Sequence, residues 1–275
     1  MTAVSARTRG IPAFLLLTFA IAWISEFGLW SLGFSLANPL AQIPAVFAPA
    51  MSAFVVRRWV TREGFADAGL RLRLRQAWPQ YLAAWLGPLV FTGTTLAIAA
   101  VLGLWQPVAP TAAQWGLITL LMLVQPLMAP ATWGEEFGWT SYLRLRLFPG
   151  RPVAATLGTG IVLSVWHYPL AFVGYAEFSE IVLGLASWTA YMMSWEIVLS
   201  WLRLRSGTIW TSSLAHIGGN MVLALLTGQA LDVDPGTQNA LMTIPVASVA
   251  VWIILTGRID GRTTRSEPPV IKTGR

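Results

Sequence analysis

The sequence predicts an all-α, polytopic membrane protein with about eight transmembrane helices, and three observations carry this prediction. Hydrophobic residues make up 55% of the 275-residue chain and charged residues only 11%, whereas soluble domains carry about 25% charged residues. The mean hydropathy is +0.61. Long apolar runs, each bounded by charge, proline or glycine, divide the chain into candidate spans of about 20 residues.

The predicted spans follow one another with short connections, so we expect a single transmembrane helical domain over residues 1–260 and a polar, disordered tail over 261–275. The first run is long for a signal-peptide core, and we predict a span there. The fourth run is too long for one simple span, and Pro126 and Pro130 are expected to break or kink it. The eight runs are 11–33, 38–57, 79–103, 113–147, 153–174, 181–202, 208–228 and 238–257.

The distribution of basic residues predicts the orientation in the membrane. If the N-terminus is cytoplasmic, all 18 lysines and arginines lie in the cytoplasmic segments and the helix ends that abut them. These segments are 1–10, 58–78, 144–152, 203–207 and 258–275. The outer loops hold only acidic charges. The positive-inside rule therefore predicts that both termini are cytoplasmic. Basic residues in loops that abut lipid headgroups account for the net charge of +6, so we predict no nucleic-acid partner.

The longest cytoplasmic segment, 58–78, contains alternating leucine and arginine from Leu70 to Arg75. Two interpretations are open. The arginines anchor the topology, or the segment lies at the interface and binds anionic lipid.

Ionisable residues inside the predicted spans give the clearest functional signal, because each costs several kcal/mol unless it is paired or faces water. At a rise of 1.5 Å per residue, Glu135, His167 and His216 lie roughly 13 to 25 Å from the inner boundary, so three helices could present them to one cavity. His216 and Asn220 are four residues apart and share a helix face. The full set is Glu26, Glu135, Glu136, His167, Glu196 and His216, and it includes both histidines of the chain.

These residue types suit hydrolysis. A carboxylate can take a proton from water while an imidazole holds that water, and a second imidazole with an amide can stabilise an oxyanion. Two imidazoles and a carboxylate also make a three-ligand zinc site, and the same residue types form proton relays in transporters. From the residues alone, hydrolysis and proton relay both remain open. Ser164, three residues before His167, is interpreted as a serine that bonds to its own helix.

The order of three motifs resembles the CPBP family of CAAX proteases and bacteriocin-processing enzymes. The chain reads E-E-F-G-W from Glu135, L-S-V-W-H up to His167, and H-I-G-G-N from His216 to Asn220. These are similar to the family motifs E-E-x-x-x-R, F-x-x-x-H and H-x-x-x-N/D. The resemblance implies a catalytic core within 131–225, in which Glu135 activates water with His167, and His216 and Asn220 bind the oxyanion.

The resemblance leaves the cofactor open: either none, or a divalent metal such as zinc held by Glu135, His167, His216 and Asn220. Asparagine is more natural as a hydrogen-bond donor than as a fourth metal ligand, which favours the metal-free arrangement. Two positions depart from the motifs, with Leu163 in place of the aromatic residue and Thr140 in place of the arginine. Leucine for phenylalanine is a packing change. Threonine cannot neutralise Glu136, so that supporting carboxyl is expected to be protonated or paired elsewhere.

We therefore predict an intramembrane endopeptidase, glutamate-dependent or metallo-type, that cleaves a membrane-anchored peptide or protein, prenylated or unmodified. The preference for arginine over lysine suggests a prokaryotic cytoplasmic membrane. Two alternatives are a non-catalytic, immunity-type binding protein and a proton-coupled carrier. A carrier should show inverted repeats, and none is detected in the sequence.

Overall fold

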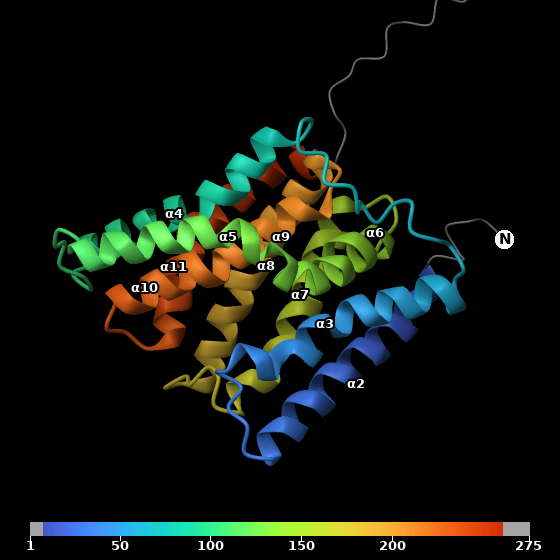
Figure 1. The fold of residues 1–275 in the computed structure, drawn as a ribbon, viewed down its shortest axis with the longest axis horizontal. Helices are drawn as coiled ribbons and strands as arrows, with labels where there is room; N and C mark the ends of the chain where they lie inside the picture. The colour runs from blue at the N-terminus through green and yellow to red at the C-terminus, as the bar shows by residue number, and fades with distance from the viewer. Residues whose placement is uncertain (1–7, 261–275) are drawn as a thin grey trace, which may run out of the picture.

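The computed structural model describes residues 8–260, and all regular structure in this range is helical. Figure 1 shows the helices stacked on one another, with α2 and α3 as one pair and α4, α5 and α11 on the opposite flank. The elements are α2 (Gly10–Ser31), α3 (Pro39–Val55), η1 (Val56–Val60), α4 (Trp78–Val101), α5 (Ala112–Gly138), η2 (Trp139–Leu143), α6 (Arg144–Arg146), α7 (Pro152–His167), η3 (Tyr168–Ala171), α8 (Ile181–Ser206), α9 (Ile209–Gly218), η4 (Gly219–Ala224), α10 (Leu225–Ala230), α11 (Pro235–Leu255) and η5 (Arg258–Asp260).

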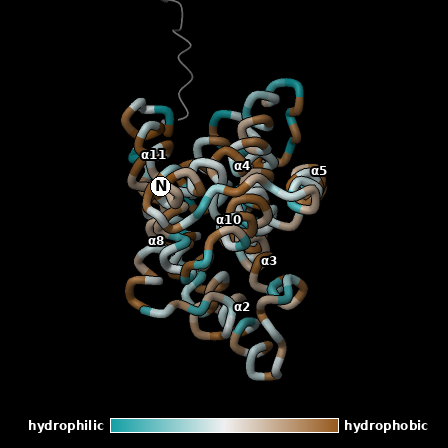
Figure 2. The backbone as a smooth tube through the Cα atoms, turned by 90° about the vertical axis from the view of Figure 1, so that its left-hand side faces the viewer, coloured by the Kyte–Doolittle hydropathy of each residue, from teal (hydrophilic) through white to brown (hydrophobic). Residues whose placement is uncertain are grey.

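Eight helical segments in this range are long and apolar enough to cross a membrane, which confirms the predicted fold class and span count. Their bounds agree with the predicted spans to within a few residues, and Figure 2 shows hydrophobic residues running along them. The predicted tail, 261–275, lies outside the described residues. The segments are Gly10–Ser31, Pro39–Val60, Trp78–Val101, Ala112–Arg146, Pro152–Ala171, Ile181–Ser206, Ile209–Ala230 and Pro235–Leu255.

Polar caps define where several of these helices begin. The side chain of Asn38 accepts a hydrogen bond from the backbone of Leu40 at the start of α3, and Thr111 forms a capping box with Gln114 at the start of α5. Such caps satisfy amide groups that the first helical turn leaves without partners. Between α8 and α9, Gly207 adopts a left-handed conformation (φ +67°), which glycine tolerates and which lets the chain reverse direction.

The fourth span was predicted to break or kink at Pro126 and Pro130, and it does not break, because α5 runs through both prolines. A proline removes the hydrogen bond to the carbonyl four residues earlier. For Pro126 that carbonyl belongs to Met122, and it accepts the indole N–H of Trp85 at 2.7 Å. A neighbouring helix thus satisfies the freed carbonyl, as occurs in membrane helices.

Three segments within residues 8–260 are wound as π-helix: η1 (Val56–Val60), η2 (Trp139–Leu143) and η4 (Gly219–Ala224). Single π-helical turns interrupt the regular i to i−4 bonding and are frequent at functional sites. Here η2 directly follows the helix that carries Glu135 and Glu136, and η4 directly follows the helix that carries His216.

Helix α5 packs against both α3 and α9. The small residues Gly134 and Gly138 permit the close approach to α3. A side-chain carbon at Gly134 would lie 2.8 Å from the carbonyl oxygen of Val46, and one at Gly138 would lie 2.9 Å from backbone atoms of Pro49. The spacing of these two glycines therefore serves helix packing.

Gly138→Ala is expected to destabilise the protein by about 1–3 kcal/mol, because the new methyl group would overlap the backbone of α3, which cannot rotate away. Gly87→Ala in α4 is the matched control, since nothing lies within 4 Å of its added carbon. Thermal unfolding of both purified variants measures the difference. Equal stability of the two variants would contradict the packing role of Gly138.

Candidate active site

Three helices bring together three of the residues predicted to be catalytic. Glu135 lies near the end of α5, His167 is the last residue of α7, and His216 lies in α9. The Nε2 atoms of His167 and His216 lie 4.0 and 3.9 Å from one and the same atom, Oε2 of Glu135. That oxygen is buried and has no hydrogen-bond partner among the described residues. The two imidazoles therefore face a single carboxylate oxygen.

Each imidazole is oriented through its other ring nitrogen. Nδ1 of His167 lies 2.9 Å from the carbonyl oxygen of Leu163. Because a carbonyl oxygen can only accept, Nδ1 carries the hydrogen, and Nε2 of a neutral His167 presents a lone pair towards Glu135. Nδ1 of His216 lies 2.7 Å from Oε1 of Glu136.

Glu135 and Glu136 thus contact the same imidazole from its two sides. Glu136 is 1% exposed, and besides His216 it receives the hydroxyl of Thr140, which lies 3.0 Å from its Oε2. Because Thr140 stands in place of the motif arginine, Glu136 was expected to be protonated or paired elsewhere. Its partners in the structure are His216 and Thr140. Thr140 also donates to the backbone carbonyl of Glu136 at 2.9 Å.

Thr140→Val is expected to lower kcat about tenfold, because it leaves Oε2 of Glu136 without its donor and loosens the group that orients His216. Thr159→Val is the matched control: Thr159 is equally buried, but its hydroxyl bonds only to the carbonyl of Ala155 in its own helix. Turnover of the two variants is compared at saturating substrate. Equal rates would show that the Thr140 hydroxyl does not support the site.

Asn220, the fourth residue predicted to be catalytic, follows His216 by four positions. Its side chain is exposed and forms no hydrogen bond with any described residue, whereas His216 is 7% exposed. Asn220 is the second residue of η4, so the π-helical turn begins between the two residues of the motif.

Glu26 and Glu196, the two remaining ionisable residues predicted inside the spans, lie close enough to this group to interact with its charges. Glu26 in α2 and Glu196 in α8 are 2% and 0% exposed, and each has one carboxyl oxygen without a partner among the described residues. Glu196 also accepts the hydroxyl of Ser200 at 2.7 Å. Ser164 donates to the carbonyl of Gly160 in its own helix, which confirms its predicted role. In the segment after η3, burial and the nearby Glu135 carboxylate raise the pKa of Tyr175.

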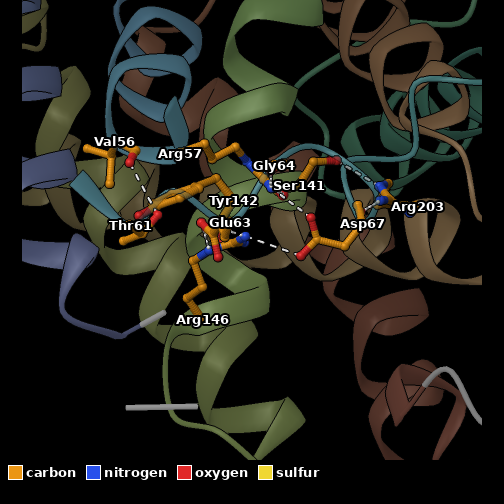
Figure 3. A network of polar contacts seen from close by, with 10 residues as sticks. All are labelled: Val56, Arg57, Thr61, Glu63, Gly64, Asp67, Ser141, Tyr142, Arg146 and Arg203. Carbon is orange, nitrogen blue, oxygen red and sulfur yellow. Dashed lines mark hydrogen bonds and ion pairs between the residues drawn. The ribbon is translucent and has the colours of Figure 1, made fainter. Parts of the chain in front are cut away.

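A network of arginines holds the backbone directly after the two glutamates (Figure 3). Arg57 is completely buried and donates to the carbonyl oxygens of Gly64 and Ser141 and to the carboxylate of Asp67, at 2.7 to 2.9 Å. Arg203 donates to the hydroxyl of Ser141 and to the backbone of Asp67, both at 2.7 Å. The π-helical turn η2 is therefore fixed from two sides.

Arg146 completes this network. It pairs with Glu63 at 3.0 Å and Asp67 at 3.2 Å, and it donates to the carbonyl of Tyr142 within η2. Segment 61–69 thus lies against the end of the helix that carries Glu135. Sequence reasoning assigned these arginines to the membrane boundary alone. These arginines lie at helix ends, and one cytoplasmic loop contains two acidic residues, Glu63 and Asp67. That combination could have indicated ion pairs between them.

The donor atoms around Glu135 are spaced more widely than metal ligands. Tetrahedral zinc with bonds of about 2.0–2.1 Å holds its donor atoms about 3.3 Å apart, whereas the two imidazole nitrogens lie 3.9 and 4.0 Å from the Glu135 oxygen. Within residues 8–260, no group of three or more histidine, aspartate or glutamate side chains is arranged to hold a metal ion. As arranged here, the residues do not fit zinc.

The fold and the site define a multi-pass integral membrane protein whose helices gather two imidazoles around a buried carboxylate. Residues 111–222 match the model of the family described as Type II CAAX prenyl endopeptidase Rce1-like. This match confirms the resemblance to the CPBP family of intramembrane proteases, and the matched range contains all four residues predicted to be catalytic. The family is one of proteases. A comparison with curated proteins finds no match.

Proposed function

We propose that the protein is an intramembrane endopeptidase that cleaves a peptide bond with a water molecule activated by Glu135 and His167. The observation that carries this proposal is the approach of two imidazole nitrogens to one buried, otherwise unpartnered oxygen of Glu135. A water molecule placed about 2.8 Å from each partner bridges separations of 4 Å. It would have the two or more polar partners that a buried water requires.

In this mechanism the water donates one hydrogen to Oε2 of Glu135 and one to the lone pair on Nε2 of His167. Its oxygen attacks the carbonyl carbon of the peptide bond, and Glu135 takes the proton as the C–O bond forms. The same proton then passes to the nitrogen of the leaving amine as the C–N bond breaks. Glu135 returns to its starting state, so the reaction consumes one water molecule.

His216 and Asn220 are proposed to stabilise the negative charge on the carbonyl oxygen. When Glu136 is ionised, Nδ1 of His216 donates to it, and donation from Nε2 as well makes His216 an imidazolium. The carboxylate of Glu136, 2.7 Å from Nδ1, supplies the counter-charge that such an ion requires in a buried position. Glu136 and Thr140 then act through His216 and are positioning residues. No metal ion enters this scheme.

The proposed substrates are membrane-anchored peptides or proteins cut near the C-terminus. The reacting groups lie on spans α5, α7 and α9, so a substrate held at the membrane reaches them most easily. The substrate's anchor, prenyl or otherwise, belongs to the proposal, as does a location in a prokaryotic cytoplasmic membrane with both termini in the cytoplasm.

A peptidase assay with the purified full chain in lipid tests the proposal. A pool of farnesylated and unmodified C-terminal peptides is offered before and after dialysis against a metal chelator, with metal analysis of the same samples. We expect cleavage that survives dialysis. Cleavage that is lost on dialysis and restored by zinc would replace the metal-free mechanism. Cleavage of no peptide would favour the non-catalytic binding alternative, with Thr140 as the first departure to test.

A further inference from the structure

An apolar groove of about 640 Å³ lies between α3 and α5 on the lipid-accessible surface, and its lining is almost entirely non-polar. Met51, Phe54 and Trp59 contribute from α3 and η1, and each is about half exposed or more. Trp133 and Phe137 of α5 line the opposite side with stacked rings, 5.0 Å between centroids. The volume is typical of sites that bind small molecules.

The groove follows α3 and η1 over a length close to the depth of one leaflet. Its lining extends from Phe47 to Trp59 along a continuous helix, a distance of roughly 18 Å at 1.5 Å per residue. Half of a hydrocarbon core of about 30 Å is about 15 Å. At the Trp59 end, Phe65 and Leu70 of the α3–α4 connection close over it. One hydrocarbon chain that enters from the membrane boundary therefore matches its direction and length.

The groove is separate from the candidate active site. Trp133 lies two residues before Glu135 and Phe137 lies two residues after it, so both point about 160° away from Glu135 around the helix. Glu135 faces α7 and α9, whereas Trp133 and Phe137 face α3. A molecule in the groove thus lies behind the helix that carries the carboxylate.

The connection that closes the groove presents uncompensated positive charge. Its two acidic residues, Glu63 and Asp67, point inward to the buried arginines Arg57 and Arg146 (Figure 3). Five arginines of the connection are exposed, and none pairs with an acidic side chain in the described part of the chain: Arg58, Arg62, Arg71, Arg73 and Arg75. Arg58 adjoins Trp59 and Arg71 adjoins Leu70, both of which line the groove.

We propose that this groove binds one anionic phospholipid, with an acyl chain between α3 and α5 and the phosphate on Arg58 and Arg71. Guanidinium groups bind phosphate oxygens in a two-point geometry, and an exposed cluster without acidic neighbours favours an anionic headgroup over a zwitterionic one. The bound lipid would cover the back of α5 beside Trp133 and Phe137. This inference does not depend on the proposed peptidase activity.

Native mass spectrometry of the full chain in detergent, titrated with dioleoyl phosphatidylglycerol or dioleoyl phosphatidylcholine, tests the site. We expect the first phosphatidylglycerol to bind more tightly than phosphatidylcholine. In the Arg58→Gln/Arg71→Gln variant, the affinity for phosphatidylglycerol should fall roughly 30-fold, because each lost arginine weakens binding about fivefold. The affinity for phosphatidylcholine should stay unchanged. Met51→Trp, which fills the groove, should weaken binding of both lipids.

Arg73→Gln/Arg75→Gln is the matched control. It removes the same charge from the same connection, at exposed positions whose neighbours Leu72 and Leu74 do not line the groove. Its phosphatidylglycerol affinity should stay within a few-fold of wild type. Equal losses in the two arginine pairs would show diffuse surface attraction and overturn the site. Equal affinity of wild type for the two lipids, or full binding by Met51→Trp, would also overturn it.

Discussion

Glu135→Gln is expected to lower kcat by about 10²–10⁴-fold while the protein stays folded. The amide has nearly the same shape as the carboxyl but cannot take a proton from water. Oε2 of Glu135 has no hydrogen-bond partner within residues 8–260, so the substitution breaks no bond that the folded state makes there. Turnover with a saturating peptide and thermal unfolding in the same lipid measure the two effects separately.

Glu196→Gln is the control for this experiment. It makes the same chemical change at a fully buried carboxyl, and the amide oxygen can still accept the hydroxyl of Ser200. We expect the Glu196 variant to keep most of its activity. Unchanged turnover in Glu135→Gln would remove Glu135 as the base, and an equal loss in both variants would indicate a general effect of lost buried charge.

Asn220→Ala is expected to lower kcat by about 10²–10³-fold with little change in KM, as the loss of one oxyanion donor does. The side chain is exposed at the start of η4 and makes no hydrogen bond to another described residue that its removal would break. A bond made only in the transition state affects turnover without weakening the substrate complex. Steady-state kinetics of the purified variant measure both constants.

Asn239→Ala in α11 serves as the control, because Asn239 also makes no side-chain hydrogen bond within the described residues and lies on a different span. It should leave both constants unchanged. A rise in KM alone for Asn220→Ala would assign Asn220 to substrate binding. Unchanged kinetics would remove it from the mechanism and leave His216 as the proposed oxyanion donor.

The fold could be predicted from the sequence because each span is an apolar run between polar boundaries, and the eight helices begin and end within a few residues of those runs. A break was one of the two outcomes expected at Pro126, but the helix does not break there, and the reason is tertiary. The indole of Trp85, distant in the sequence, satisfies the carbonyl of Met122 that the proline leaves free. The sequence of α5 alone does not indicate that a donor from α4 is present.

The meeting of Glu135, His167 and His216 could be predicted from their depth in three spans. The sequence could not predict that Glu136 lies at Nδ1 of His216 and Glu135 at Nε2. This arrangement depends on the angle between α5 and α9. The three π-helical turns were also missed. One of them, η2, is held by Arg57 and Arg203 from other parts of the chain, so local propensity does not specify it.

The arginine network also bears on how the protein can be modified chemically. Arg57 binds two carbonyl oxygens and a carboxylate at once through two separate nitrogens of its planar guanidinium, a geometry that differs from the single ammonium of lysine. Arginine thus contributes its shape as well as its charge at this boundary. Of the 18 basic residues, only Lys272 is a lysine. Reagents that couple to side-chain amines should therefore attach a probe at that one position and leave every guanidinium of the network intact.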